Sequence, residues 1–569
     1  MTTGPVAAVE AALAADRAYA DPALWIARAA DEAVRACAAA LEAEGPRDRP
    51  LWGVPFAVKD NLDVAGLPTT AACPGYSYVP EETAPAVQRL LDAGAVLLGK
   101  ANLDQFATGL VGTRSPYGTP RNPFDRLCVP GGSSSGSAVA VAAGIARFAL
   151  GTDTAGSGRV PAAFCNVVGL KPTLGSVSTR GLVPACRSLD AVSVFACTVD
   201  EALDALRVMV GFDEADPYSR GAPFAHLRRG AVPAGVRVAG IVPEVAVAAP
   251  YARAASLLGA ETVDIGEFLA VAGLLYDGPW VAERTAGLRA VVEGRPEILR
   301  PVTRAILEGG LSRRTVDAFD AFHAVASARR SAELLFARYD ALLLPTTLPC
   351  PTLAEVEADP IGANTRLGTW TNFVNLCDLA AVAVPAGLGE DGLPFGVTLV
   401  GSAWSEGRLA ALADRVHRAL TATWGASGEP LPPPAPPDPM QGDETALFCV
   451  GAHMAGLPLN GQVTALGGRF VRAERTIPAY RLHALGPRPG LYRVKQDGGA
   501  VEGEVWAVPT ASIGALLTQI PPPLGFGTVE LESGPCLGFL AEPACCAGAR
   551  DITQHGGWRR WLAEQAACA

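Results

Sequence analysis

Two glycine- and serine-rich segments, separated by one apolar run, constrain this chain more than any other feature of its sequence. The first is Pro130-Gly-Gly-Ser-Ser-Ser-Gly-Ser137 and the second is Gly151-Thr-Asp-Thr-Ala-Gly-Ser-Gly158. Glycine permits sharp turns and close approach of the backbone to a ligand. The Ala-rich run behind the first segment predicts a helix, whose N-terminal N–H groups favour anions. With further N–H groups from Thr154–Ser157, the pattern predicts an oxyanion-binding arrangement.

Composition predicts a large packed core and excludes several kinds of partner. Of 569 residues, 49% are hydrophobic and only 18% are charged, which excludes global disorder. The formal net charge is −11 and Lys and Arg form no basic stripe, so we expect no nucleic-acid partner. No uncharged apolar stretch reaches the ~18 residues of a membrane span, and the N-terminus lacks the pattern of a signal peptide. We therefore expect no membrane association.

Cysteine usage predicts a reducing compartment. The 13 cysteines are irregularly spaced and include no Cys-x-x-Cys pair. Such residues are typical of reduced, buried thiols in a cytoplasmic protein. We expect neither a metal nor a cofactor.

Alternating helical and strand patterns predict an α/β fold around one central mixed sheet surrounded by helices. Residues 7–44 have apolar residues at helical intervals, and Pro50–Asn61 reads as a buried strand that ends in Lys59. We assign residues 1–424 to this domain. Residues 425–440 are proline-rich and predict an extended linker.

A second domain of different texture is predicted over residues 441–569. Short β-like runs separated by Gly and Pro indicate a small β-rich (α+β) domain, closed by an amphipathic helix over 558–566. The predicted strands include Gln462–Leu466.

The serine segments fit nucleophilic catalysis better than phosphate binding. No Gly-Lys-Ser/Thr and no Gly-x-Gly-x-x-Gly pattern is present. A serine nucleophile needs a base, and none of the six histidines lies near the serines in sequence. A buried Lys59 is a candidate base if desolvation lowers its pKa. The alternative is a structural lysine paired with Asp60 or Asp63.

Residues 131–173 closely resemble the amidase signature, and the wider resemblance extends from about Leu51 to Val416. The resemblance implies a Ser-cisSer-Lys triad in which Ser157 is the nucleophile. Ser133 would be the bridging serine with a cis peptide bond, and Lys59 the base. It also implies that the oxyanion lies on the N–H groups of Thr154, Ala155 and Gly156.

Further residues resemble the allophanate hydrolase branch of this family. Ser135, Ala155 and Gly158 depart from the commonest signature, and Asn102–Gly118 and Val450–Gly461 are similar to segments of that branch. The implied substrate is allophanate, a small planar anion whose carboxylate suits a guanidinium.

The resemblance also implies which side chains recognise the substrate. Tyr276-Asp-Gly-Pro-Trp-Val-Ala-Glu-Arg284 matches the family segment that supplies a tyrosine and an arginine to the substrate. The alternative for Arg284 is a surface arginine paired with Glu283.

The role of the second domain is left open. The resemblance implies that it assists decarboxylation of the product, with His453 as its most plausible polar centre. A packing and dimerisation module is the alternative. A homodimer and a functional link to urea carboxylase are also implied.

Three other functions compete with allophanate hydrolysis. One is another small-molecule amidase of the same family. A transamidase component for aminoacyl-tRNA suits neither the extra domain nor the lack of basic surface. A catalytically dead binding module would be expected to have lost Lys59, Ser133 or Ser157, and all three are present.

Overall fold

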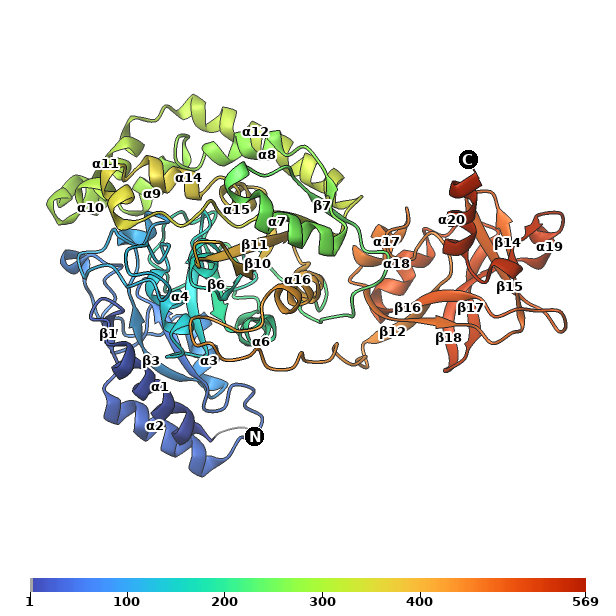
Figure 1. Ribbon diagram of the computed structural model, residues 1–569, viewed down its shortest axis with the longest axis horizontal. Coiled ribbons are helices and arrows are strands. Elements are labelled where there is room, and N and C mark those ends of the chain that lie inside the picture. Colours follow the sequence, from blue (N-terminus) through green and yellow to red (C-terminus); the bar gives the residue numbers. More distant parts are fainter. Residues whose placement is uncertain (1–3, 569) are drawn as a thin grey trace. The chain divides into compact units, whose positions relative to one another are not determined.

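The computed structural model describes residues 4–568, and it forms two compact units (Figure 1). The first unit comprises the residues up to 222, 238–334 and 341–434. The second comprises 223–237, 335–340 and the residues from 435 onward. Two short segments from the first two-thirds of the chain thus belong to the second unit, where Ala231 N–H donates to Phe470 O over 3.0 Å.

The first unit is built on one sheet of eleven strands in the order β1-β3-β2-β4-β6-β5-β10-β11-β9-β7-β8. The strands are β1 Trp25–Arg28, β2 Pro55–Lys59, β3 Val96–Ala101, β4 Phe148–Asp153, β5 Val168–Lys171, β6 Ala191–Ala196, β7 Val238–Gly240, β8 Glu261–Thr262, β9 Ala341–Pro345, β10 Ala380–Leu388 and β11 Pro394–Gly401. Strand β2 pairs in parallel with β3 and β4, whereas β4 and β6 are antiparallel. The α/β prediction of a mixed central sheet is confirmed.

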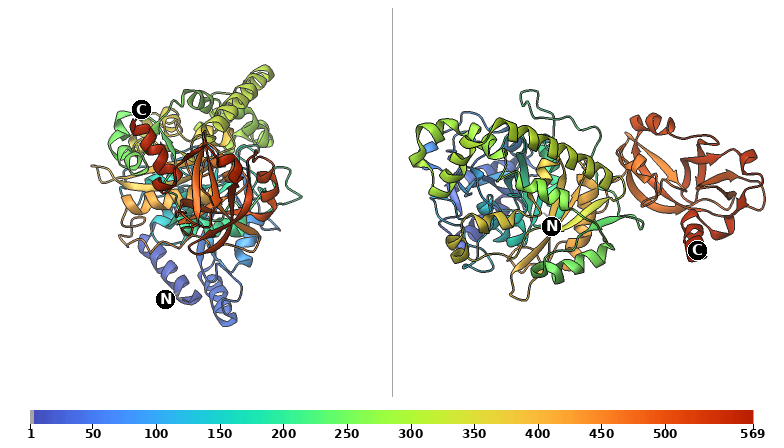
Figure 2. Two further views of the ribbon diagram at one scale, coloured as in Figure 1. Left: turned by 90° about the vertical axis from the view of Figure 1, so that its right-hand side faces the viewer. Right: turned by 90° about the horizontal axis from the view of Figure 1, so that it is seen from above.

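Helices surround this sheet, as the views in Figure 2 show. They are α1 Pro5–Tyr19, α2 Asp31–Glu44, α3 Pro85–Asp92, α4 Ser135–Ala142, α5 Val160–Phe164, α6 Val199–Met209, α7 Val245–Leu258, α8 Gly266–Gly273, α9 Trp280–Gly287, α10 Arg289–Gly294, α11 Pro301–Gly309, α12 Thr315–Phe336, α13 Leu353–Ala358, α14 Gly362–Leu367, α15 Asn372–Leu376 and α16 Glu406–Leu420. No helix in the described part of the chain is long and apolar enough to cross a membrane.

The N-terminal region differs from the sequence prediction of helices alone over 7–44. Strand β1 lies between α1 and α2 and pairs antiparallel with β3. The helical spacing of Leu24 and Ile26 with their neighbours is therefore misleading, because the sheet edge offers these residues backbone partners.

The second unit contains two sheets, which confirms the predicted β-rich domain. The five-stranded sheet has the order β13-β16-β12-β18-β17, and the three-stranded sheet has the order β15-β14-β19. The strands are β12 Glu444–Cys449, β13 Arg469–Arg475, β14 Tyr480–Leu485, β15 Arg488–Arg493, β16 Glu502–Pro509, β17 Leu524–Leu531, β18 Gly534–Ala541 and β19 Arg550–Asp551. The helices are α17 Asn460–Thr464, α18 Ile513–Leu517, α19 Pro543–Cys546 and α20 Trp558–Cys568.

One predicted strand of the second unit is a helix. Residues 462–466 fall on the end of α17 and the turn after it. Only Val463 of this stretch is fully buried, and Gly467, with a φ of +85°, supports the turn that ends it. A single buried apolar residue does not fix a strand period, so the prediction was wrong.

The sheet brings the two halves of the site together. Strands β2 and β4 are parallel neighbours, with Val58 beside Leu150. Their carboxyl ends therefore meet at one sheet edge, and Lys59 lies next to the start of the second serine segment. Helix α4, which begins within the first segment, is buried along its whole length and contacts β2, β3 and β4.

Candidate active site

Lys59 lies at the end of β2 and is completely buried. Its Nζ donates to Ser133 Oγ over 2.7 Å, to Ser134 Oγ over 2.9 Å and to Thr152 Oγ1 over 2.8 Å. All three acceptors are neutral hydroxyls. Neither carboxylate considered as a partner of Lys59 contacts it: Asp60 pairs with Lys100, and Asp63 accepts a hydrogen bond from the Tyr78 hydroxyl.

The surroundings of Lys59 favour its neutral form. Burial lowers the pKa of Lys59 from 10.5 to about 7, while the carboxylates of Asp104, Asp190 and Asp153 oppose this and Arg284 reinforces it. A lysine with a pKa near the working pH can accept a proton and return it. Lys59 therefore has the acid–base properties that a serine nucleophile requires of its base.

Ser133 is held by the loop that precedes α4. The Gly132–Ser133 peptide bond is cis. Asp104 N–H donates to Ser133 O over 3.1 Å, and the Asp104 carboxylate accepts from the N–H groups of Gly112 and Arg114. A Cβ on Gly132 would lie 2.1 Å from Asp104 Oδ2, so this position requires glycine.

Ser157 lies in the turn between β4 and α5, almost completely buried. Asp153 organises this turn, because its carboxylate accepts from the N–H groups of Gly156 and Gly158 and forms an ion pair with Arg159 at 2.8 Å. Among the described residues, no hydrogen bond joins Ser157 to Ser133 or Lys59. The structure thus joins Lys59 to Ser133 directly and places Ser157 on the neighbouring turn.

The expected oxyanion donors are not equivalent. Gly156 N–H already donates to Asp153 Oδ1 over 2.9 Å. This hydrogen bond leaves the N–H groups of Thr154 and Ala155 as the candidate oxyanion donors. Thr371 Oγ1 donates to Ala155 O over 2.6 Å and so fixes the same peptide segment from the other side.

Arg284 is buried on helix α9, with 1% of its surface exposed. Its Nη1 donates to Ala107 O over 3.3 Å and to Thr108 Oγ1 over 3.1 Å. Its guanidinium lies 5.5 Å from the centre of the Tyr276 ring, so the two expected recognition residues stack. The alternative for Arg284 was a surface ion pair with Glu283. Glu283 instead accepts hydrogen bonds from Ser188.

His453 lies in the second unit, half-buried in the turns after β12. Its Nε2 is 2.9 Å from Gln462 Oε1, and its ring stacks on Phe539 with centroids 4.4 Å apart. Burial lowers the pKa of His453, against the hydrogen bond to Gln462, and so favours the neutral imidazole.

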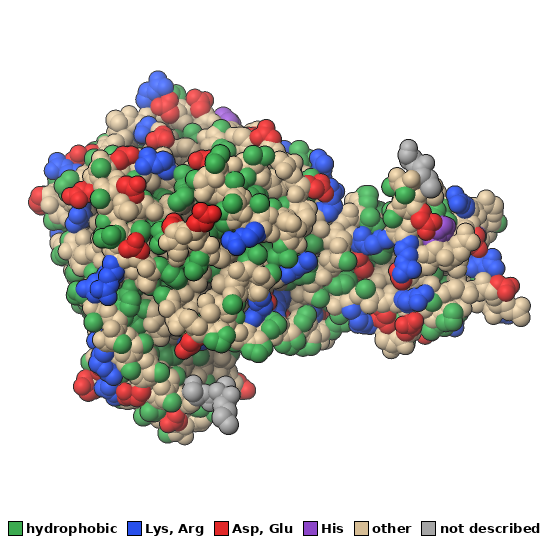
Figure 3. Space-filling model, in the orientation of Figure 1, with side chains coloured by type: hydrophobic (Ala, Val, Ile, Leu, Met, Phe, Trp, Pro, Cys, Tyr) green, Lys and Arg blue, Asp and Glu red, His purple; other side chains and the backbone are tan. Residues whose placement is uncertain are grey.

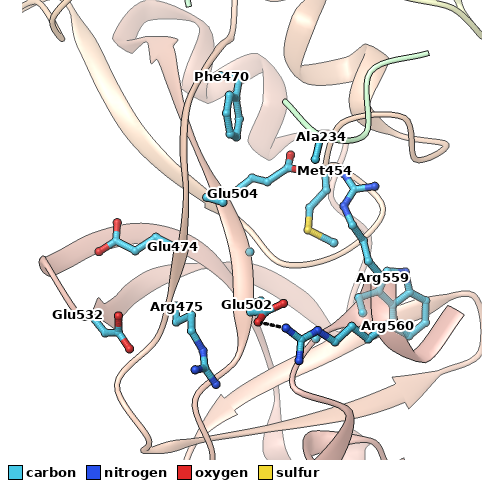
Figure 4. Close-up of a pocket in the computed structure, with 14 residues that line it drawn as sticks. Ala234, Met454, Phe470, Glu474, Arg475, Glu502, Glu504, Glu532, Arg559 and Arg560 are labelled. Atoms are coloured by element: carbon cyan, nitrogen blue, oxygen red, sulfur yellow. Dashed lines mark hydrogen bonds and ion pairs between the residues drawn. The ribbon is translucent and has the colours of Figure 1, made fainter. Parts of the chain in front are cut away.

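A groove of about 470 Å³ also lies in the second unit (Figure 4). Its walls carry paired charges: Glu504 with Arg559 at 2.7 Å and Glu502 with Arg560 at 2.5 Å. Met454 lines this groove, whereas His453, the residue before it, is not among the lining residues.

Sequence reasoning missed two of the three acceptors of Lys59. Ser134, the residue before α4, makes no side-chain cap on this helix and instead accepts a hydrogen bond from Lys59. Ser135 and Ser137 donate to the carbonyls of Asn102 and Leu150 and do not reach the lysine. Thr152 gave no signal beyond its place in the second serine segment.

Comparison with known proteins identifies the family of this chain. A model of the amidase family matches residues 7–410, and a model described as the allophanate hydrolase C-terminal domain matches residues 445–563. The chain is 42% identical over 548 residues to urea amidolyase from Saccharomyces cerevisiae, covering 91% of this chain and 30% of that protein.

Solved structures and other relatives extend the match. The allophanate hydrolase of Kluyveromyces lactis superposes with a TM-score of 0.78 and 39% identity, covering 99% of this chain and 97% of that one. A glutamyl-tRNA(Gln) amidotransferase subunit from Nitratidesulfovibrio vulgaris is 37% identical, over 67% of this chain and 87% of that protein. The chain therefore belongs to the amidase family and carries, after its amidase domain, an allophanate hydrolase C-terminal domain.

Proposed function

We propose that this chain hydrolyses allophanate. The observation that carries the proposal is the match of both units to one hydrolase, at 39% identity and over 97% of its chain. The contact between a buried Lys59 and Ser133 supports it, because it supplies the base that amide hydrolysis by a serine requires. The chain spans about 30% of the length of the urea amidolyases that it matches, so their complete activity is not assigned to it.

In the proposed mechanism, Lys59, Ser133 and Ser157 act in sequence. Neutral Lys59 accepts the Ser133 proton while Ser133 accepts the proton of Ser157, whose Oγ attacks the amide carbonyl of allophanate. The N–H groups of Thr154 and Ala155 stabilise the oxyanion, and removal of one such donor costs ~3 kcal/mol in comparable enzymes. The proton returns through Ser133 to the leaving nitrogen, and ammonia departs.

The acyl-enzyme then reacts with water. Lys59 and Ser133 remove a proton from the water, the Ser157 ester bond breaks, and N-carboxycarbamate is released. Loss of CO2 gives carbamate, which decomposes to a second ammonia and a second CO2. Neither step requires a metal or a cofactor.

We assign substrate recognition to Tyr276 and Arg284. A guanidinium can bind the allophanate carboxylate through two parallel hydrogen bonds. The hydrogen bond from Nη1 to Ala107 O holds the Arg284 guanidinium in place for such binding. Ala107 itself has a left-handed φ of +51°. Arg284→Ala should raise the KM for allophanate by about 100-fold, the value of a ~3 kcal/mol charged hydrogen bond. An unchanged KM would contradict the assignment, and Arg289→Ala, an exposed arginine after α9, is the control.

We propose that His453 is the polar centre of the second unit and assists decarboxylation. Its burial, which favours the neutral imidazole, and its hydrogen bond to Gln462 support this role. His453→Asn should slow release of the second ammonia and leave the first unchanged. If both ammonia molecules appear at the wild-type rate, the second unit is a packing and dimerisation module instead.

The substrate assignment is tested by comparing amides. Ammonia release should be fastest from allophanate, and slower from biuret, malonamide and aliphatic amides. A preference for one of the neutral amides would favour another small-molecule amidase of the same family. A Ser157→Ala variant is the control for background hydrolysis.

We further propose a cytoplasmic homodimer linked in function to urea carboxylase. Exposed apolar side chains along α12, Val316, Phe319 and Phe322, support a protein interface there. Sedimentation should give a dimer, and Phe319→Glu should shift it toward monomer.

Every cysteine whose side chain is described is a free thiol, which supports the proposal of a reducing compartment.

Along the sequence we keep the proposed boundaries of 1–424, 425–440 and 441–569. We propose no nucleic-acid partner, because the net charge is −11 and the basic side chains form no stripe. On the face shown in Figure 3, Lys and Arg side chains are interspersed with Asp and Glu.

A further inference from the structure

A buried carboxylate outside the expected triad contacts the turn that carries Ser157. Asp190 immediately precedes strand β6 and is 5% exposed. Thr154 Oγ1 donates to Asp190 Oδ1 over 2.5 Å. The backbone N–H of Thr154 is also one of the two proposed oxyanion donors, so a single residue connects the carboxylate to the proposed reaction centre.

Asp190 is itself fixed by the backbone of the turn before it. Its carboxylate accepts from Ala185 N–H over 2.9 Å and from Cys186 N–H over 3.1 Å. Burial raises the pKa of Asp190 to about 6, against the hydrogen bond from Thr154 and the nearby Arg284. With these partners, the carboxylate holds the Thr154 side chain in one orientation.

The same turn is tied to the helix that carries Arg284. Ser188 donates to Glu283 through its N–H over 2.8 Å and through its Oγ over 2.7 Å. Cys186 Sγ lies 3.1 Å from the same carboxylate. Residues 185–190 therefore connect the turn of Ser157 on one side to helix α9 on the other.

We propose that Asp190 is a positioning residue that fixes Thr154 in the oxyanion-binding turn and aligns this turn with the substrate-recognition helix α9. The inference rests on the proposed function. The physical reason is that an oxyanion donor stabilises the transition state only where it is held within about 0.5 Å of its productive place. A threonine side chain anchored at Oγ1 restrains its own backbone N–H.

Four variants test the Thr154–Asp190 hydrogen bond in the complete chain. Thr154→Val removes the hydroxyl at nearly constant volume and should lower kcat about tenfold with KM within about twofold, because the loss falls on the transition state. Thr154→Ser retains the hydroxyl and should stay within about threefold of wild-type kcat. Asp190→Asn should lower kcat at least as far as Thr154→Val. The double variant Thr154→Val/Asp190→Asn should lose no more kcat than Asp190→Asn alone, because both changes remove the same hydrogen bond.

Ser178→Ala is the matched control. Ser178 Oγ donates to Asp213 Oδ2 over 2.6 Å, a similarly short hydroxyl–carboxylate contact between two residues that have no part in the proposed mechanism. Its kcat should stay within about twofold of wild type. All variants are compared by thermal unfolding, so that a loss of kcat is scored only in protein with a wild-type transition.

Three results would overturn the proposal: wild-type kcat in folded Thr154→Val, an equal loss in Thr154→Ser, or losses that multiply in the double variant. Each variant is assayed on both allophanate and malonamide. If the wild-type chain hydrolyses malonamide but not allophanate, the proposed substrate fails, and the malonamide rates still decide the role of Asp190. A wild-type chain inactive on every amide would overturn both.

Discussion

Two buried lysines on neighbouring strands have partners of different charge: neutral hydroxyls for one and a carboxylate for the other. Lys59 ends β2, and Lys100 lies on β3, where it pairs with Val58 of β2. Both are completely buried. Lys59 Nζ donates to three hydroxyls, whereas Lys100 Nζ lies 3.1 Å from Asp60 Oδ1 and donates to Thr69 Oγ1 over 3.0 Å.

The difference shows how one sheet can hold both a proposed catalytic base and a structural ion pair. Burial penalises an ammonium, and neutral hydroxyls compensate it less than a carboxylate does. The pKa of Lys59 therefore falls to about 7. Burial also lowers the pKa of Lys100, but the Asp60 carboxylate in direct contact opposes this. Contact with Asp60, rather than burial, separates the two lysines.

The largest effect is expected from removing the base. Lys59→Met should lower kcat about 10⁴-fold, as loss of a member of a catalytic triad does in serine hydrolases. Lys59→Arg should be equally inactive, because an arginine stays protonated. Thermal unfolding should show no loss of stability in Lys59→Met, since a buried amine without a carboxylate partner is replaced by an apolar chain of similar length. Residual activity above one per cent in either variant would remove Lys59 from the mechanism.

Breaking the Lys100 pair should instead affect stability. Asp60→Asn or Lys100→Met leaves one buried partner uncompensated and should lower the free energy of unfolding of the first unit by about 3–5 kcal/mol. Urea unfolding monitored for that unit measures the change. The folded fraction should keep near wild-type kcat, and a catalytic loss without a stability loss would place Lys100 in the chemistry.

The pH dependence should follow Lys59. Its neutral form is the base, so kcat/KM should rise about tenfold per pH unit below a pKa near 7 and become level above it. The profile is measured with allophanate between pH 5 and 9. A rate that is flat across this range, or that falls as pH rises through 7, would contradict the assignment of Lys59 as base.

The smallest effect is expected from the hydroxyl partners. Thr152→Val removes one acceptor that stabilises the ammonium of Lys59, so its pKa should fall further. The acidic limb of the pH profile should move to lower pH by less than about one unit. Thr69→Val, the equivalent change beside Lys100, should leave the profile in place. An upward shift in Thr152→Val would show that this hydroxyl favours neutral Lys59 instead.

Much of the candidate site could be proposed from the sequence because its motifs are local. The paired serine segments indicated an oxyanion site, and the resemblance to the amidase signature selected Lys59, Ser133 and Ser157 over six histidines and neighbouring serines. Ser134, Thr152 and Asp190 were not predicted. Their roles depend on which side chains meet at the ends of β2 and β4, and no spacing within one segment reveals such contacts.

The sequence by itself determined the fold class, the proline-rich segment and the β-rich texture that follows it, because periodicity and turn residues act locally. It did not determine that β1 separates two helices, or that 223–237 and 335–340 join the second unit, because these segments are fixed by partners distant in sequence. Only the tertiary structure decided that Lys59 meets hydroxyls while Lys100 meets Asp60. In a buried site, the identity of the neighbour sets the cost of a charge, and that neighbour is chosen by the packing of the sheet.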